Sequence, residues 1–253
     1  MHCTNYGSTL KEKYPRLAKK LKISSKAAKT KKAKCFSRAE VERFVGLSTP
    51  GAKNKQQRAL ASLAFLGGLR CAELRSVQIE GIKAVGGGLQ VDFEGVKRTA
   101  EQADRSFGIP EGVFCTVVKE HIAMLEASGI TSGPVARRPS KDNCKFDLPP
   151  IGKNTLYLLP KAIAVALQLD PQGYSGHSLR RSSAKAAADG GATTFDLRRH
   201  YGWASEAVPQ RYVDGSTAAQ ARMASFILSQ TQPLSQPVSH DVNIRLTIDV
   251  KHT

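Results

Sequence analysis

The sequence predicts an α+β fold that is mainly helical and contains a small antiparallel β-sheet. Two observations carry this prediction. Apolar residues recur at helical spacing in several separate runs of the 253-residue chain. Residues 77–109 instead contain three short extended segments, in which apolar and polar residues alternate between glycine-rich or polar turns. The length allows one large domain or two small ones.

The first predicted helix begins after Ser37, which forms a capping-box sequence with the glutamate three residues later. Its apolar face consists of Val41, Phe44 and Val45. A second helix is predicted over residues 54–66 and ends at the pair Gly67 and Gly68. Arg70 follows this stop, where a rigid element can aim its side chain.

Extended segments are predicted at 77–82, 89–93 and 106–109, and they form a meander with one buried face. A helix follows over 113–127, and the composition of residues 132–150 predicts a loop. The next helix, over 154–169, is expected to kink or restart at Pro160 because proline lacks the backbone N–H. Further helices are predicted at 176–189, 195–201, 206–213 and 216–229.

The composition indicates a polyanionic partner. Lys and Arg number 38 against 21 Asp and Glu, so the formal net charge is +17. Nucleic acid is the leading candidate, because neutralising phosphates releases condensed counterions. An anionic membrane surface is the rival, yet the sequence contains no run of about 18 apolar residues and no basic amphipathic anchor. No signal-peptide pattern follows Met1, so secretion is not predicted.

The five cysteines are odd in number and widely spaced, without a Cys-x-x-Cys pair or a Cys/His cluster. Neither a metal site nor a disulfide framework is therefore predicted. Reduced thiols fit a nuclear location if the host is eukaryotic, and otherwise a cytoplasmic or nucleoid location.

Residues 176–213 contain side chains suited to phosphate chemistry. His177 and Arg180 are three positions apart, so in a helix they share a face and can converge on one anion. The indole of Trp203 can donate one hydrogen bond, and Tyr212 is a candidate nucleophile. Upstream, the segment LGGLRCAEL carries Arg70, whose planar guanidinium suits a forked grip on phosphate.

The order and spacing of LGGLRCAEL, GHSLRR, and GW with a tyrosine nine residues after the tryptophan resemble tyrosine recombinases, in particular those of Crypton transposons. The resemblance implies their catalytic-domain fold and DNA strand cleavage and rejoining through a 3′-phosphotyrosyl intermediate, without metal, ATP or another cofactor. It implies that Tyr212 is the nucleophile, that His177 accepts or relays its proton, and that Arg70 and Arg180 bind the scissile phosphate. Trp203 occupies a position where relatives carry His or Trp.

The same resemblance assigns further residues. Lys97 matches a hairpin lysine that serves as general acid for the leaving 5′-oxygen, and Glu73 would buttress Arg70. Candidates for additional DNA binding are Arg98, Arg105 and Arg181. His200 and Tyr201 lie close to the motif, but the nine-residue interval favours Trp203 and Tyr212.

Each of these residues has an ordinary structural explanation when taken alone, and only the joint pattern favours an enzyme. Three alternatives stay open. The first is a type IB topoisomerase-like relaxase that works as a monomer. The second is a domesticated DNA-binding protein without cleavage activity, and the third is a binder of RNA or membrane surfaces that acts through charge alone.

The predicted organisation has three parts. Residues 1–36 form a basic N-terminal tail or the remnant of an upstream DNA-binding domain, and a disordered tail, a DNA-tracking arm and a nuclear-localisation patch stay open. Relatives carry a core-binding domain upstream, so the chain is either a fragment or a reduced form. Residues 37–230 form the catalytic domain. Residues 231–253 form a C-terminal tail, which is a late strand or docks on a neighbouring subunit. The active assembly is expected to be a homo-oligomer on DNA, a dimer or a tetramer.

Overall fold

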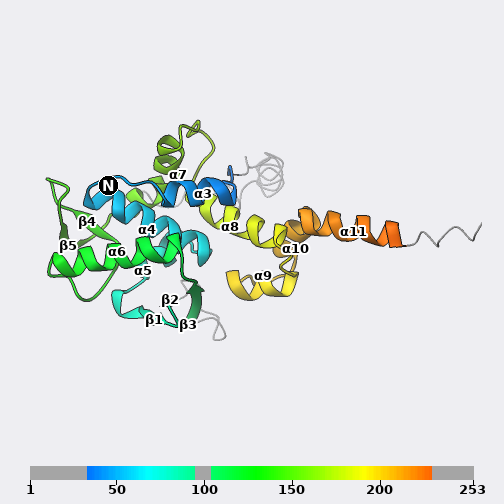
Figure 1. The fold of residues 1–253 in the computed structure, drawn as a ribbon, viewed down its shortest axis with the longest axis horizontal. Coiled ribbons are helices and arrows are strands. Elements are labelled where there is room, and N and C mark those ends of the chain that lie inside the picture. The colour runs from blue at the N-terminus through cyan, green and yellow to red at the C-terminus, as the bar shows by residue number, and fades with distance from the viewer. Residues whose placement is uncertain (1–32, 95–103, 230–253) are drawn as a thin grey trace, which may run out of the picture.

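A computed structural model describes residues 33–94 and 104–229 of the chain. Figure 1 shows a body of helices with a small sheet on one side and a long helix that extends away from it. The N-terminal elements are α3 (Arg38–Val45), α4 (Ala52–Leu66), α5 (Cys71–Ser76), a 3-10 turn (Ile79–Gly81), β1 (Ile82–Val85), β2 (Gly88–Glu94) and β3 (Asp104–Ile109). The remaining elements are α6 (Val113–Ala127), β4 (Arg137–Pro139), β5 (Phe146–Pro150), α7 (Lys153–Ala166), α8 (Ser178–Asp189), α9 (Thr194–Tyr201), α10 (Ala207–Asp214) and α11 (Thr217–Ser229). The predicted α+β class is confirmed.

Helix α4 is the centre of the main hydrophobic core. It packs against α3, α6 and α8, and most of its length is buried. The α3 helix begins with the predicted capping box at Ser37, and its predicted apolar face is buried against this core. A helix that is buried on several faces needs apolar or small residues around its circumference, which explains the run ALASLAFL at the end of α4.

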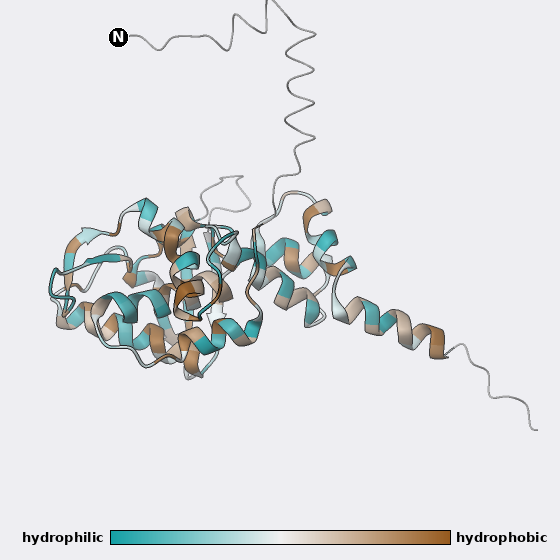
Figure 2. Ribbon diagram, turned by 90° about the horizontal axis from the view of Figure 1, so that it is seen from above, coloured by the Kyte–Doolittle hydropathy of each residue, from teal (hydrophilic) through white to brown (hydrophobic). Residues whose placement is uncertain are grey.

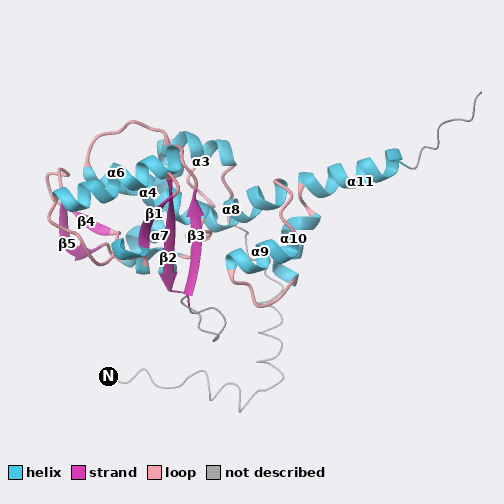
Figure 3. Ribbon diagram, turned by 60° about the horizontal axis from the view of Figure 1, so that its bottom comes forward, coloured by secondary structure: helices cyan, strands magenta, loops and turns pink. Residues whose placement is uncertain are grey.

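Strands β1, β2 and β3 form one antiparallel sheet in that order (Figure 3). The predicted alternation in β2 is confirmed, since its buried positions include Leu89, Val91 and Phe93. Phe93 pairs with Arg105 of β3. Residues 95–103, between β2 and β3, lie outside the described residues, and so do Lys97 and Arg98 among them.

Two predictions about local structure are corrected, and one short helix was missed. The extended segment expected over 77–82 contains the 3-10 turn at Ile79–Gly81, and its strand begins only at Ile82. Gly81 allows β2 to lie close to this turn, because a Cβ there would lie 2.5 Å from the Asp92 carbonyl oxygen. The short helix α5, which directly follows Arg70, was not predicted. The region 132–150 is not a plain loop, since β4 and β5 pair within it, apart from the main sheet (Figure 3).

Buried polar contacts hold the β4–β5 hairpin in place. The guanidinium of Arg137 donates to the carbonyls of Leu148 and Ser132, the latter at 2.6 Å, and its backbone N–H donates to Gln56 of α4 at 2.7 Å. At the hairpin turn, Asn143 accepts from two backbone N–H groups at the start of α4. These long-range partners override a composition that is typical of loops.

Helix α7 runs through Pro160 as one helix, so it does not restart there. Proline removes the hydrogen bond that the carbonyl of Leu156, four residues earlier, normally accepts. The thiol of Cys71 lies 4.0 Å from that carbonyl oxygen and 3.4 Å from the carbonyl oxygen of Gly176, to which it donates.

A second, smaller core lies between α8, α9 and α10 and consists of Ala184, Ala188, Leu197 and Tyr201. Beyond it, α11 projects from the rest of the molecule (Figure 2). Near the N-terminal end of the described residues, Phe36 belongs to the main core, and its ring stacks on that of Tyr174 at 4.2 Å. The predictions for residues 1–32 and 230–253 lie outside the described residues, and the division into 1–36, 37–230 and 231–253 stays a prediction.

The glycine pair after α4 allows two elements to approach the end of this helix closely. A Cβ on Gly67 would lie 2.5 Å from the ring of Phe107 in β3. Gly68 has φ +56, and a Cβ there would lie 2.1 Å from the ring of Tyr201. The sheet and α9 therefore meet the end of α4 where no side chain stands between them.

We expect Gly68→Ala to lower the free energy of unfolding by about 2–4 kcal/mol, since it adds left-handed backbone strain to a steric clash. The matched control is Gly86→Ala, because Gly86 has φ +54 and nothing within 4 Å of the added methyl group. This control carries only the strain, about 1–2 kcal/mol. Urea unfolding measures both losses, and equal losses would contradict the clash.

Candidate active site

A buried carboxylate, Glu73, lies at the centre of the candidate site. Arg70 is the N-cap of α5, and Glu73 is the third residue of that helix. The Glu73 carboxylate accepts from the backbone N–H of Arg70 at 2.7 Å and from its guanidinium at 2.6 Å. The side chain of Glu73 is only 1% exposed. The start of α5 therefore fixes the orientation of Arg70 through both its backbone and its side chain.

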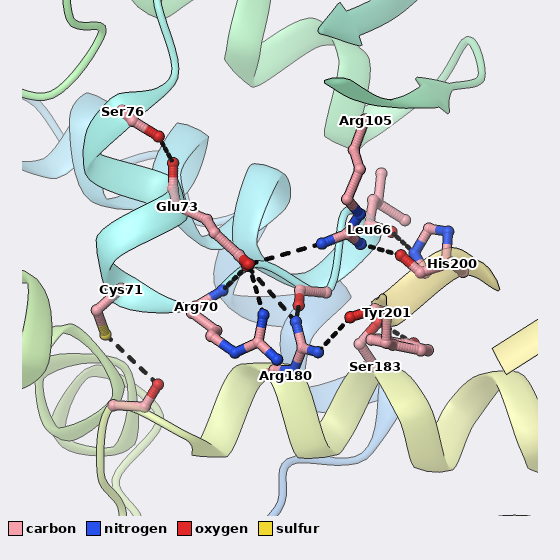
Figure 4. A network of polar contacts seen from close by, with 12 residues as sticks. Leu66, Arg70, Cys71, Glu73, Ser76, Arg105, Arg180, Ser183, His200 and Tyr201 are labelled. Atoms are coloured by element: carbon pink, nitrogen blue, oxygen red, sulfur yellow. Dashed lines mark hydrogen bonds and ion pairs between the residues drawn. The ribbon is translucent and has the colours of Figure 1, made fainter. Parts of the chain in front are cut away.

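Two further guanidinium groups face the same carboxylate (Figure 4). The Nη1 atoms of Arg105 and Arg180 lie 3.6 and 3.5 Å from its oxygens. Three cations and one anion meet here, so the group carries a net charge of +2. The exposed fraction of the side chain is 28% for Arg70, 12% for Arg105 and 7% for Arg180. The excess positive charge is therefore most accessible at Arg70.

Backbone carbonyls from two helix ends orient Arg180. Its Nη1 donates to Gly68 at 2.6 Å, just beyond α4, and its Nη2 donates to Tyr201 at 2.5 Å, at the end of α9. Burial, together with the charge of Arg70, lowers the pKa of Arg180 to about 10. The group still carries its charge at neutral pH.

Three aromatic rings continue the site toward Tyr212. The rings of Tyr201 and Trp203 stack at 4.7 Å, and those of Trp203 and Tyr212 stack at 5.7 Å and 9°. The Cζ atom of Arg180 lies 5.4 Å from the centre of the Trp203 ring, within reach of a cation–π interaction. A continuous series of contacts thus joins Arg70, through Glu73, Arg180 and Trp203, to Tyr212.

The structure resembles solved recombinases and integrases. XerH site-specific recombinase, in a post-cleavage complex with palindromic difH substrate, matches with a TM-score of 0.61 and 16% identity over 78% of this chain and 54% of its own. XerA recombinase matches with a TM-score of 0.56 and 15% identity over 80% of this chain and 67% of its own. Tn1549 transposon integrase, in complex with a circular intermediate DNA, matches with a TM-score of 0.53 and 11% identity over 78% of this chain and 67% of its own.

The chain has the fold of a tyrosine recombinase catalytic domain. It spans about half the length of the XerH recombinase. Its sequence matches no protein-family model, and no curated protein is significantly similar to it. The likeness therefore concerns the tyrosine recombinase fold, and the roles of individual residues rest on the geometry of the site.

The two residues predicted to transfer protons are His177 and Lys97. His177 is exposed at the N-cap of α8, three residues before the buried Arg180. Lys97 lies outside the described residues. The structure does not test the role of either residue, so both assignments stay predictions.

The candidate DNA-binding arginines differ in their surroundings. Arg105 directs its guanidinium to protein acceptors, as described above for Glu73. Arg181 donates to the backbone carbonyl of Ala33, in the segment before α3. Arg98 lies outside the described residues.

The two residues that sequence spacing set aside have structural roles. Tyr201 is 1% exposed, its hydroxyl lies 2.6 Å from the hydroxyl of Ser183, and burial raises its pKa to about 12. A phenol so placed is a poor nucleophile, whereas Tyr212 is only half-buried. The imidazole Nε2 of His200 lies 2.9 Å from the carbonyl oxygen of Leu66, and burial lowers its pKa. No spacing in the sequence indicates these contacts.

Two further features concern metals and membranes. Within residues 33–94 and 104–229, no group of three or more His, Cys, Asp and Glu side chains is arranged to hold a metal ion. In the same ranges, each helix falls short of the length and apolar character needed to cross a bilayer.

We expect Glu73→Gln to lower the free energy of unfolding by about 3–5 kcal/mol, because it leaves three neighbouring guanidinium groups without their anion. Glu42→Gln is the control, since Glu42 forms a surface pair with Arg38 at 2.7 Å. A pair of that kind contributes about 0.3–0.5 kcal/mol. Denaturant unfolding at constant pH compares the two. A loss at Glu73 as small as that of the control would show that the carboxylate does not hold the arginines together.

Proposed function

We propose that the protein cleaves and rejoins strands of double-stranded DNA, with Tyr212 as the nucleophile. The observation that carries this proposal is the unbroken series of contacts that joins Arg70, Glu73 and Arg180 to the Trp203 and Tyr212 rings. The proposal is also supported by the fold, which XerH recombinase and Tn1549 integrase use in complexes with DNA. A net charge of +17 suits a duplex substrate.

The proposed reaction is a transesterification. The phenol oxygen of Tyr212 attacks the scissile phosphorus, an O–P bond forms, and the bond from phosphorus to the 5′-oxygen breaks. His177 accepts or relays the phenol proton, and Lys97 supplies the proton that the leaving 5′-oxygen takes up. Rejoining reverses each transfer. The new phosphotyrosyl bond retains the energy of the broken one, so the proposed reaction needs no ATP. The guanidinium groups of Arg70 and Arg180 supply the positive charge that a metal ion would otherwise provide.

Arg70 and Arg180 would bind the non-bridging phosphate oxygens, where negative charge builds up. Because the guanidinium of Arg180 is fixed by two backbone carbonyls and Glu73, little reorganisation is needed when the anion arrives. Arg70 is the more exposed of the two and is the first that an incoming phosphate would meet. Trp203 can add one N–H donor.

A Crypton origin and a nuclear location stay sequence-based predictions.

We expect Tyr212→Phe to abolish covalent protein–DNA adducts while DNA binding stays nearly intact, since only the nucleophilic oxygen is lost. The measurement uses a randomised pool of nicked duplexes, in which the cleaved end diffuses away and the adduct is trapped under denaturing conditions. Tyr157→Phe is the control, because Tyr157 is an exposed tyrosine on α7.

Adducts that persist in Tyr212→Phe would refute the nucleophile assignment. A wild-type protein that binds DNA but gives no adduct would be a binding protein that retains only the fold. Relaxation of supercoiled DNA by a monomer would identify a topoisomerase-like enzyme.

We also propose that the protein assembles on DNA as a homo-oligomer through α11. The apolar residues of this helix are 60–73% exposed: Met223, Phe226, Ile227 and Leu228. The first three share a face at helical spacing. A groove of about 520 Å³ between the main core and α9 has an apolar lining that includes Phe65, Phe114, Ala187 and Leu197. We propose that α11 of one copy binds in this groove of a second copy.

We expect the double substitution Phe226→Ser with Ile227→Ser to leave folding intact but to keep the protein monomeric on DNA, because it removes the apolar contact area. Gln220→Ser is the control on the same exposed helix. Sedimentation of the protein with duplex DNA measures the assembly size. Oligomers of unchanged size in the double variant would show that another surface makes the contact.

A further inference from the structure

Arg105 links three parts of the structure that are far apart in the sequence. It lies on β3, opposite Phe93 of β2, and its guanidinium Cζ is 5.0 Å from the centre of the Phe93 ring. One of its terminal nitrogens faces the Glu73 carboxylate at 3.6 Å. The other donates to the backbone carbonyl of His200, at the end of α9. Figure 4 shows the side chain reaching from the sheet across to both partners.

The segment that Arg105 holds leads directly to Trp203. Helix α9 ends at Gly202, which adopts φ 59 and ψ 49, and the backbone N–H of Trp203 donates to Arg198 at 3.1 Å. A Cβ on Gly202 would lie 3.4 Å from Nη1 of Arg105, so the guanidinium packs against this turn. Arg105 therefore contacts the turn on the N-terminal side of Trp203, and the Trp203 ring in turn stacks on Tyr212.

These contacts give Arg105 a structural role that Arg70 does not share. Its side chain is 12% exposed, less than half the exposed fraction of Arg70. Arg180 is buried still more deeply, at 7% exposed, but of these two arginines only Arg105 joins the sheet to the turn before Trp203. A role that acts through other residues fits this environment better than a phosphate contact does.

We propose that Arg105 is a positioning residue, which fixes the turn of residues 200–203 against Glu73 and so sets the place of Trp203 and Tyr212 relative to Arg70 and Arg180. The catalytic part of this inference rests on the proposed function. The structural part does not, because it concerns the position of an indole ring. A displacement of about 1 Å in an active site can cost up to 10²-fold in rate, so loss of this link would slow the reaction without removing any group that touches DNA.

The chain contains a single tryptophan, Trp203, which makes the structural part measurable without a substrate. In Arg105→Ala we expect the tryptophan emission to shift to longer wavelength and its quenching by acrylamide to increase, because the turn and its ring stack loosen. Arg105→Lys keeps the charge, but a compact ammonium cannot bridge both acceptors, so we expect an intermediate effect.

Arg43→Ala is the matched control for these measurements. Arg43 also donates from its guanidinium to a backbone carbonyl, that of Leu167 at 3.2 Å, but it does so from α3. We expect this variant to keep wild-type emission and quenching. If Arg105→Ala does not fold, Arg105→Lys tests the same contact, since it keeps the charge but loses the two-way bridge.

The activity arm separates positioning from DNA contact. We expect Arg105→Ala to slow adduct formation about 10–100-fold, while its DNA affinity and the salt dependence of that affinity match those of Arg43→Ala. Unchanged tryptophan emission and quenching in Arg105→Ala and Arg105→Lys would overturn the proposal. So would a weaker affinity with a salt slope reduced by about one, which indicates a direct phosphate contact. If the wild-type protein forms no adduct, the proposed function fails, and the fluorescence result still decides whether Arg105 positions Trp203.

Discussion

The pairing of one buried carboxylate with three guanidinium groups is the interaction on which the site depends. Glu73 is almost completely enclosed, and an unpaired anion in such a place would cost several kcal/mol. The same holds in reverse, since Arg180 and Arg105 are also largely buried and lie close to Arg70. Each charge is tolerable only because the others are present. Helices α5 and α8 and strand β3 must therefore converge at this point, whatever else the chain does.

This convergence is possible because two chain segments meet without side chains between them. Gly67 and Gly68 let the rings of Phe107 and Tyr201 approach the end of α4. The carbonyls that remain there are not left unsatisfied, because Arg180 donates to Gly68 and His200 lies within hydrogen-bond distance of Leu66. The segment LGGLR thus combines a helix stop, a close packing surface and a charged side chain. Its glycines allow the close packing that shapes the site, and its arginine contributes positive charge.

The sequence predicts the parts of this structure that depend on local pattern. The amphipathic helices, the capping box at Ser37 and the alternation in β2 follow from periodicity, and they were found. The hairpin β4–β5 was missed, because contacts to Gln56 and the start of α4 hold it, and these are distant in sequence. For the same reason, motif spacing indicated Arg70, Glu73 and Arg180 but not the place of Arg105. That place depends on the register between Phe93 and Arg105, which no local pattern fixes.

The distribution of exposure among the three arginines explains how the site can be stable without a ligand and still attract an anion. Arg180 and Arg105 donate to backbone carbonyls and lie next to the Glu73 carboxylate, so they stabilise the fold before any ligand binds. One carboxylate cannot neutralise three cations, and the remaining charge is most accessible at Arg70. A singly charged phosphodiester would lower the net charge of the cluster from +2 to +1, which reduces the mutual repulsion of the arginines. The net positive charge of the cluster thus favours the binding of an anion next to the stacked rings of Tyr201, Trp203 and Tyr212.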